Sequence, residues 1–207
     1  MAKLYFNYGA MASGKTIEVI ETAYKYNSKN MHAVLAKPRI DTRGNDKVVS
    51  RIGMERETDF TIGKNETFIE HLKKFDNITC LIVDEAQFLT RIQVLELFYL
   101  AKRLNLPVIC YGLKVNFRGE LFEGSKALLE FADTLNELVA ICSCGRKARF
   151  NARKVNNQYV YEGDVVVIGA DEAYEPMCGN CFVDKVLLQH SKDFQIFEKN
   201  KIKVLQK

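Results

Sequence analysis

The sequence predicts an α/β fold on a parallel sheet, followed by a small β-rich lobe. Apolar strand candidates alternate with amphipathic helix candidates up to residue 141, as in a parallel α/β sandwich. A glycine-rich loop joins the first strand to the first helix, and beyond residue 141 four cysteines cluster. We therefore expect an α/β domain over residues 1–141, a lobe over 142–190 and a flexible, lysine-containing tail over 191–207.

The glycine-rich loop has the form of a phosphate-binding loop. An aromatic-rich strand candidate over residues 3–8 precedes it, and a helix candidate over 16–24 follows. Amide N–H groups in such a loop, together with the positive end of the helix, bind phosphates. The candidate cofactor-binding residues here are Gly9, Ala10, Met11, Ala12, Ser13, Gly14, Lys15 and Thr16.

Two side chains of the loop have separate expected roles. Lys15 is expected to reach the β- and γ-phosphates as a mobile charge, and the Thr16 hydroxyl to bind Mg²⁺. The alternative is a glycine turn that only joins a strand to a helix. The loop indicates a nucleotide but does not identify a reaction.

The second strand is expected over residues 31–37 and ends at Pro38. The polar turn over 41–46 follows it, on the edge of the sheet where ligands bind, beyond the carboxyl ends of the strands. Residues 47–63 are expected to be irregular or a short hairpin, with Arg51 and Arg56 on the solvated surface. Helical spacing follows over 66–75.

A continuous apolar run over residues 78–83 predicts a fully buried parallel strand, and Asp84 and Glu85 follow it directly. An acid at this place in a protein with a phosphate-binding loop holds Mg²⁺, directly or through water. The alternative for Asp84 is a helix cap. Glu85 is expected to point elsewhere and to be free for another task.

The remaining elements of the first domain follow the same alternation. We expect a helix over residues 91–104, a buried strand over 107–112, an aromatic loop over 113–122, a short helix over 125–132 and a last strand over 134–141. Cys80 and Cys110 lie inside strands and are expected to be small core residues.

The other four cysteines predict one structural zinc site in a lobe with little helix. Cys142, Cys144, Cys178 and Cys181 form two close pairs, and four thiolates close a tetrahedral coordination sphere. The alternative is four free thiols. The first pair is separated by one residue, which is less usual than two.

Composition excludes several classes of protein. The chain has 207 residues, 47% of them hydrophobic and 27% charged, which is ordinary for a soluble globular protein. A net charge of +4 is too small to indicate nucleic-acid binding. No apolar run approaches the ~20 residues that span a bilayer, and we expect no signal peptide before the first strand. We expect a cytoplasmic protein that binds neither nucleic acid nor membrane.

The ordered set of motifs resembles the type II thymidine kinases. It comprises the phosphate-binding loop, Asp-Thr-Arg at 41–43, Asp-Glu-Ala-Gln-Phe at 84–88 and the four-cysteine lobe, over about residues 4–181. The resemblance implies a RecA-like P-loop NTPase core and a zinc-stapled lobe that carries a "lasso" loop. It also implies ATP-dependent phosphorylation of the 5′-hydroxyl of thymidine, and of deoxyuridine, in nucleotide salvage.

The resemblance also implies roles for individual residues. Glu85 is the catalytic base, Asp41 and Arg43 lie near the transferred phosphate, Asp84 associates with magnesium, and Gln87 joins the cofactor-binding set. The lasso over residues 165–174 closes over the base, and Asn151 stands where the family usually has a small hydroxyl residue. The residues expected to bind thymidine are Met11, Leu113, Phe117, Phe122, Asn151, Val167, Ile168, Gly169 and Tyr174.

The family is usually a homotetramer that thymidine triphosphate inhibits as end product, and both properties are implied here. The family's first cysteine pair has two intervening residues, whereas this chain has one. An alternative function is a zinc-containing ATPase that nucleic acid stimulates. Against it, the basic residues over 146–154 are local and acidic residues follow over 162–175, so no continuous basic stripe is visible.

Overall fold

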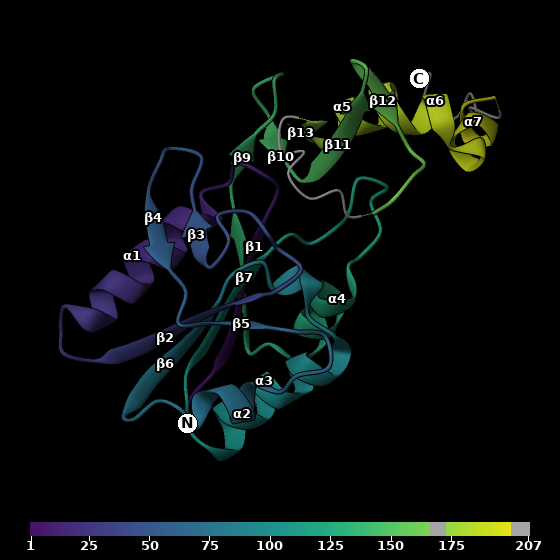
Figure 1. The fold of residues 1–207 in the computed structure, drawn as a ribbon. Coiled ribbons are helices and arrows are strands. Elements are labelled where there is room, and N and C mark those ends of the chain that lie inside the picture. The colour runs from purple at the N-terminus through teal and green to yellow at the C-terminus, as the bar shows by residue number, and fades with distance from the viewer. Residues whose placement is uncertain (166–172, 200–207) are drawn as a thin grey trace.

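The computed structural model describes residues 1–165 and 173–199, and its centre is a six-stranded parallel sheet in the order β5-β2-β6-β7-β1-β8 (Figure 1). Parallel pairing with intervening helices confirms the predicted α/β class. The strands are β1 (Leu4–Gly9), β2 (His32–Pro38), β5 (Phe60–Ile62), β6 (Ile78–Val83), β7 (Val108–Gly112) and β8 (Thr134–Leu138).

Helices cover both faces of this sheet. On one face α1 (Lys15–Asn27) buries Val19 and Ala23 against alternate strand residues such as Leu35 and Ile82. On the other face lie α2 (Phe68–Leu72), α3 (Arg91–Arg103) and α4 (Glu123–Phe131). Successive side chains of a strand point to opposite faces, which is why β6 places Cys80 in one core and Leu81 in the other.

The segment between β2 and β5 contains the short hairpin that the sequence allowed. Strands β3 (Lys47–Val49) and β4 (Glu55–Glu57) pair antiparallel. Arg51 at the hairpin's turn is exposed, as predicted, whereas Arg56 is half-buried. Cys80 and Cys110 are fully buried in the core, which confirms their predicted place.

The second lobe joins a small hairpin, a three-stranded antiparallel sheet and a series of short helices. The hairpin is β9 (Ala140–Ile141) with β10 (Lys147–Ala148). The sheet contains β11 (Phe150–Val155), β12 (Gln158–Val160) and β13 (Tyr174–Met177), in the order β12-β11-β13. The helical elements are α5 (Gly179–Phe182), the π-helix η3 (Val183–Leu187), α6 (Leu188–His190) and α7 (Lys192–Lys199).

The prediction of little helix after residue 141 is wrong for residues 179–199. Phe182 and Val186 are four positions apart and both are buried in the core of this lobe, so they give α5 and η3 a packed face. The Phe182 ring stacks on Phe150 with 4.6 Å between ring centroids. Helix α7 lies within the predicted tail. Among the described residues, no helix is both long and apolar enough to cross a membrane.

Candidate functional site

The phosphate-binding loop connects the carboxyl end of β1 to α1, as the sequence predicts. Its tight course requires left-handed backbone at Ala12 (φ 60°) and Gly14 (φ 84°). At Gly9 a Cβ atom would lie 2.7 Å from the carbonyl oxygen of Leu138, so only glycine fits at that point.

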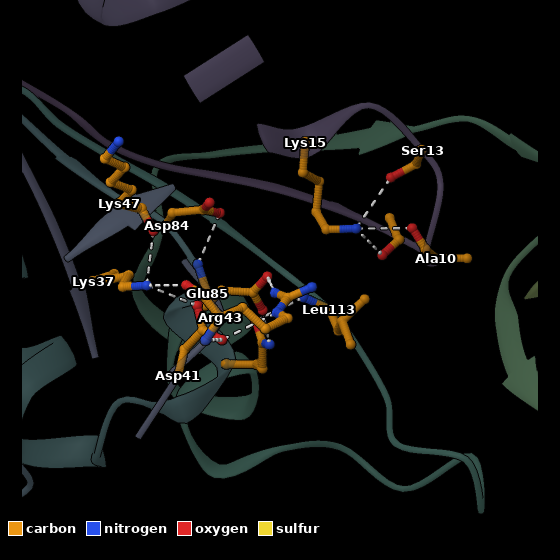
Figure 2. Close-up of polar contacts among 12 residues, drawn as sticks. Ala10, Ser13, Lys15, Lys37, Asp41, Arg43, Lys47, Asp84, Glu85 and Leu113 are labelled. Carbon is orange, nitrogen blue, oxygen red and sulfur yellow. Dashed lines mark hydrogen bonds and ion pairs between the residues drawn. The ribbon is translucent and has the colours of Figure 1, made fainter. Parts of the chain in front are cut away.

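Lys15 folds back onto its own loop. Its Nζ donates to the carbonyl oxygens of Ala10 at 2.8 Å and Gly9 at 3.2 Å, and to Ser13 Oγ at 3.3 Å (Figure 2). Burial lowers the pKa of Lys15 to about 8, although the nearby carboxylates of Glu85 and Asp84 oppose this shift. A buried ammonium held by carbonyl groups is a strong point charge for an incoming phosphate.

The two acids that follow β6 are both buried, with Asp84 3% exposed and Glu85 7% exposed. Glu85 adopts left-handed backbone (φ 51°), and its N–H donates to Asp84 Oδ1 at 2.9 Å. Burial, followed by the charge of Glu85, raises the pKa of Asp84 to about 7. A carboxyl group so deprived of water favours either a proton or a cation.

The Glu85 carboxylate is held on both sides. Gln87 Nε2 donates to Glu85 Oε2 at 2.5 Å, and Arg43 Nη2 donates to Glu85 Oε1. The Gln87 amide is itself oriented, because its Oε1 accepts the N–H of Leu113 at 3.0 Å. Gln87 is therefore in contact with the Glu85 carboxylate, and its expected place in the cofactor-binding set stays a prediction.

Asp41 and Arg43 lie together, next to a lysine that sequence reasoning missed. Arg43 Nε donates to Asp41 Oδ1 at 3.0 Å, and Lys37 Nζ contacts Asp41 Oδ2 at 3.3 Å. The available signal was a lysine inside an otherwise apolar strand, at the end of β2. The structure thus extends the Asp41–Arg43–Glu85 group into the interior of the protein (Figure 2).

One cavity of about 620 Å³ brings most of the predicted site residues together. Val167, Ile168 and Gly169 lie outside the described residues. Gly9, Ala10 and Asp84 adjoin the cavity in sequence but do not line it. The predicted residues that do line it are Met11, Ala12, Ser13, Gly14, Lys15, Thr16, Asp41, Arg43, Glu85, Gln87, Leu113, Phe117, Phe122, Asn151 and Tyr174.

The sequence did not predict two parts of the cavity wall. The end of β3 and the turn of the β3–β4 hairpin contribute Val49, Ser50, Arg51 and Ile52. Phe88 also lines the cavity and packs edge-on against Phe122, with 5.8 Å between ring centroids. The hairpin carried no motif in the sequence, so only the fold could place it here.

Asn151 connects the second lobe to the phosphate-binding loop. Its Oδ1 accepts the N–H of Met11 at 2.7 Å, and the side chain is buried. This bond crosses from β11 to the loop after β1, so it is one of the hydrogen bonds that join the two lobes.

The four cysteines of the second lobe converge, and they could hold a metal ion. Their sulfur atoms all lie within 4.8 Å of one another, and the Cys144 and Cys178 sulfur atoms are 3.6 Å apart. Zinc with Zn–S bonds of ~2.3 Å needs sulfur atoms ~3.8 Å apart in a tetrahedron, so the donor set fits. Left-handed Gly145 (φ 83°) closes the turn that contains Cys142 and Cys144, and its N–H donates to the carbonyl oxygen of Cys142 at 2.8 Å.

The pKa of the Cys142 thiol lies below its usual value, which favours metal binding. Burial raises its pKa, but hydrogen bonds from the backbone N–H groups of Cys144 and Cys178 outweigh burial and bring the pKa down to about 6. The thiolate is the form that binds metal.

Comparison with known proteins assigns the chain to a family of similar sequences. A sequence profile described as "Thymidine kinase" matches residues 2–182. The thymidine kinase of Rhodopirellula baltica is 40% identical over 204 residues, which cover 97% of each chain. Those of Haemophilus influenzae and Lactiplantibacillus plantarum are 44% and 45% identical, each over 86% of this chain and 94% of theirs.

Proposed function

Because the chain belongs to the thymidine kinase family, we propose that its cavity transfers the γ-phosphoryl group of ATP to the 5′-hydroxyl of thymidine. The observation that carries this proposal is one cavity lined by the phosphate-binding loop, a buried carboxylate and aromatic side chains. Phosphoryl transfer needs alignment and charge compensation more than covalent chemistry from the protein.

Glu85 is the proposed general base. Gln87 aims its carboxylate, and a carboxylate placed beside a hydroxyl accelerates proton removal by about 10²–10⁴-fold. Arg43 bonds to Glu85 and would turn to the phosphates when ATP binds. Lys15 would bind the same phosphates, so that two cations oppose the charge on the transferred group.

The hydroxyl of Thr16 and the carboxylate of Asp84 are the proposed magnesium contacts. Both offer the hard oxygen ligands that Mg²⁺ prefers. Bound magnesium would supply charge neutralisation at the phosphates. Zinc held by Cys142, Cys144, Cys178 and Cys181 would be structural, since four thiolates leave no open position.

The aromatic end of the cavity is the proposed thymidine site. Leu113, Phe117, Phe122, Asn151 and Tyr174 all line it, and they offer flat apolar contacts together with one amide. Deoxyuridine, which lacks only a methyl group, is proposed as a weaker substrate. A cytoplasmic homotetramer that thymidine triphosphate inhibits also remains our proposal.

The test is a phosphorylation assay with ATP against a panel of nucleosides, performed on wild type and Glu85→Gln. We expect thymidine to be the best acceptor, and Glu85→Gln to bind ATP and thymidine while losing at least about 100-fold in kcat. Glu130→Gln, which changes a surface carboxylate paired with Arg91, is the matched control. Near-normal turnover of Glu85→Gln would remove Glu85 from this role.

The nucleic-acid-stimulated ATPase is tested in the same assay. Thymidine, and not DNA or RNA, should raise ATP turnover above its basal rate. Stimulation by nucleic acid alone would contradict the proposed function.

A further inference from the structure

Lys37 is a buried cation that has no part in the proposed reaction. It lies near the carboxyl end of β2, and its side chain is completely buried, at 0% exposure. A lysine is almost never fully buried unless its charge is paired, because removing an ammonium from water is costly. We therefore expect the Lys37 ammonium group to make interactions that an apolar side chain could not make.

The ammonium group of Lys37 has a partner for each of its three N–H bonds. It donates to the carbonyl oxygen of Arg43 at 2.7 Å and to that of Lys47 at 2.9 Å, and it lies 3.3 Å from Asp41 Oδ2. These partners span the loop that leaves β2 and begins the β3–β4 hairpin. One side chain thus fixes three points of this loop.

This loop carries the groups that face the reaction. The other oxygen of Asp41 accepts from Arg43 Nε at 3.0 Å, and Arg43 in turn contacts the Glu85 carboxylate. The hairpin that begins at Lys47 places Arg51 on the cavity wall. A continuous set of contacts therefore runs from Lys37 through Asp41 and Arg43 to Glu85 (Figure 2).

Loss of Lys37 would change both charge and geometry in this loop. The carbonyl groups of Arg43 and Lys47, which are part-buried, would lose this donor. Among these contacts, Arg43 would be the remaining cationic partner of Asp41. Arg43 would then be drawn toward Asp41 and away from the position from which it contacts Glu85 and would turn to the phosphates. The aromatic end of the cavity comes from other elements and would stay in place.

We infer that Lys37 is a positioning residue for phosphoryl transfer, which sets Arg43 and the hairpin through Asp41 and two backbone carbonyl groups. This inference rests on the proposed function. A displacement of ~1 Å in a reacting group costs up to about 100-fold in rate. Lys37 is thus required for the rate of transfer, and the affinity for thymidine does not depend on it.

The experiment compares Lys37→Met with Lys102→Met. Lys102 likewise pairs with the carboxylate of Asp133 and donates to the backbone carbonyl of Ala2. These contacts lie at the end of β1 opposite the cavity. We expect kcat of Lys37→Met to fall between about 10- and 100-fold. Thymidine affinity, measured by titration calorimetry, should change less than about threefold, and Lys102→Met should keep wild-type kcat.

Two results would overturn the inference. One is a Lys37→Met enzyme with wild-type kcat for each thymidine-binding site. The other is an equal loss of kcat and of thymidine binding, which is the result of a purely structural role. If Lys37→Met does not fold, Lys37→Gln, which keeps two N–H donors without the charge, is measured against the same criteria. Failure of the wild type to phosphorylate thymidine would instead refute the proposed function.

Discussion

Replacement of Asp84 by asparagine should stabilise the ligand-free protein, although it removes a proposed magnesium contact. Asp84 is 3% exposed, and burial together with the charge of Glu85 raises its pKa from 3.8 to about 7. Asparagine keeps the oxygen that accepts the Glu85 N–H at 2.9 Å, and it carries no charge. The substitution therefore removes a buried charge at little cost in hydrogen bonding.

The magnitude follows from the pKa of Asp84. The shift is about three pH units, and one unit corresponds to ~1.36 kcal/mol, so ~4 kcal/mol is the upper limit of the gain. Because part of the shift belongs to Glu85, we expect about 2–4 kcal/mol at pH 8. For a chain of this size that gain raises Tm by roughly 4–16 °C.

The direction in which the stability difference changes with pH follows from the two pKa values of Asp84. The folded protein keeps the Asp84 proton up to about pH 7, whereas the unfolded chain loses it near pH 3.8. Between these values the unfolded chain binds fewer protons, so stability falls as pH rises. The Tm advantage of Asp84→Asn should therefore be absent near pH 4, grow between pH 4 and 7, and stay constant above pH 7.

The assay is thermal unfolding from pH 4 to 8 in magnesium-free buffer without chelator, so that any bound zinc stays in place. Asp133→Asn is the control, and its stability at neutral pH should change in the opposite direction. Although burial raises the pKa of Asp133, hydrogen bonds from Lys102 lower it overall, so this variant should lose stability at neutral pH. A Tm difference for Asp84→Asn that does not vary with pH, or a lower Tm at pH 8, would refute the reasoning.

Three further predictions concern the loop, the lobe and their connection. Burial lowers the pKa of Lys15 to about 8, so near pH 8 about half of the molecules carry the charge, and bound phosphates should restore it in the rest. ATP binding at this pH should therefore take up about half a proton per site. Calorimetry in two buffers of different ionisation enthalpy measures the proton uptake, and its absence would contradict the prediction. Stripping metal with a zinc chelator should raise hydrogen exchange in residues 140–190 before the central sheet, and unchanged exchange there would contradict a structural zinc. Asn151→Ala should cost about 1–3 kcal/mol in stability, since the Met11 N–H loses its acceptor, and denaturant unfolding measures this loss. The variant should also raise KM for both substrates, which steady-state kinetics measures. Wild-type stability together with wild-type KM values would contradict the prediction.

The α/β core could be predicted because its signals are local. Continuous apolar runs mark β6 and β7, and the glycine spacing of residues 9–16 is dictated by the backbone conformation that phosphate binding needs. Asp84 and Glu85 could be placed at the site because they directly follow a buried strand, whose carboxyl end faces the ligand in such sheets. In each case a short stretch of chain contains both the pattern and its physical reason.

The residues that the sequence missed depend on contacts distant along the chain. The sequence gives Lys37 no role beyond the strand, because its partners are carbonyl oxygens that the loop after β2 supplies only in the folded protein. The helices over 179–199 are short, and the packed face of α5 and η3 depends on core residues distant in sequence, such as Phe150, which stacks on Phe182. The hairpin turn reaches the cavity through the path of the chain between β2 and β5, and no motif records that path.

Three features of the site oppose folding, and all three belong to groups that the proposed reaction uses. Asp84 is a buried carboxyl group with a raised pKa, Lys15 is a buried ammonium with a lowered pKa, and Glu85 adopts left-handed backbone that costs of order 1 kcal/mol or more in a residue other than glycine. A cation beside Asp84 and a polyphosphate beside Lys15 would relieve the first two. If the proposed ligand contacts are correct, burial that is unfavourable in the free protein would strengthen the binding of both ligands, because Asp84 and Lys15 would each gain a partner of opposite charge.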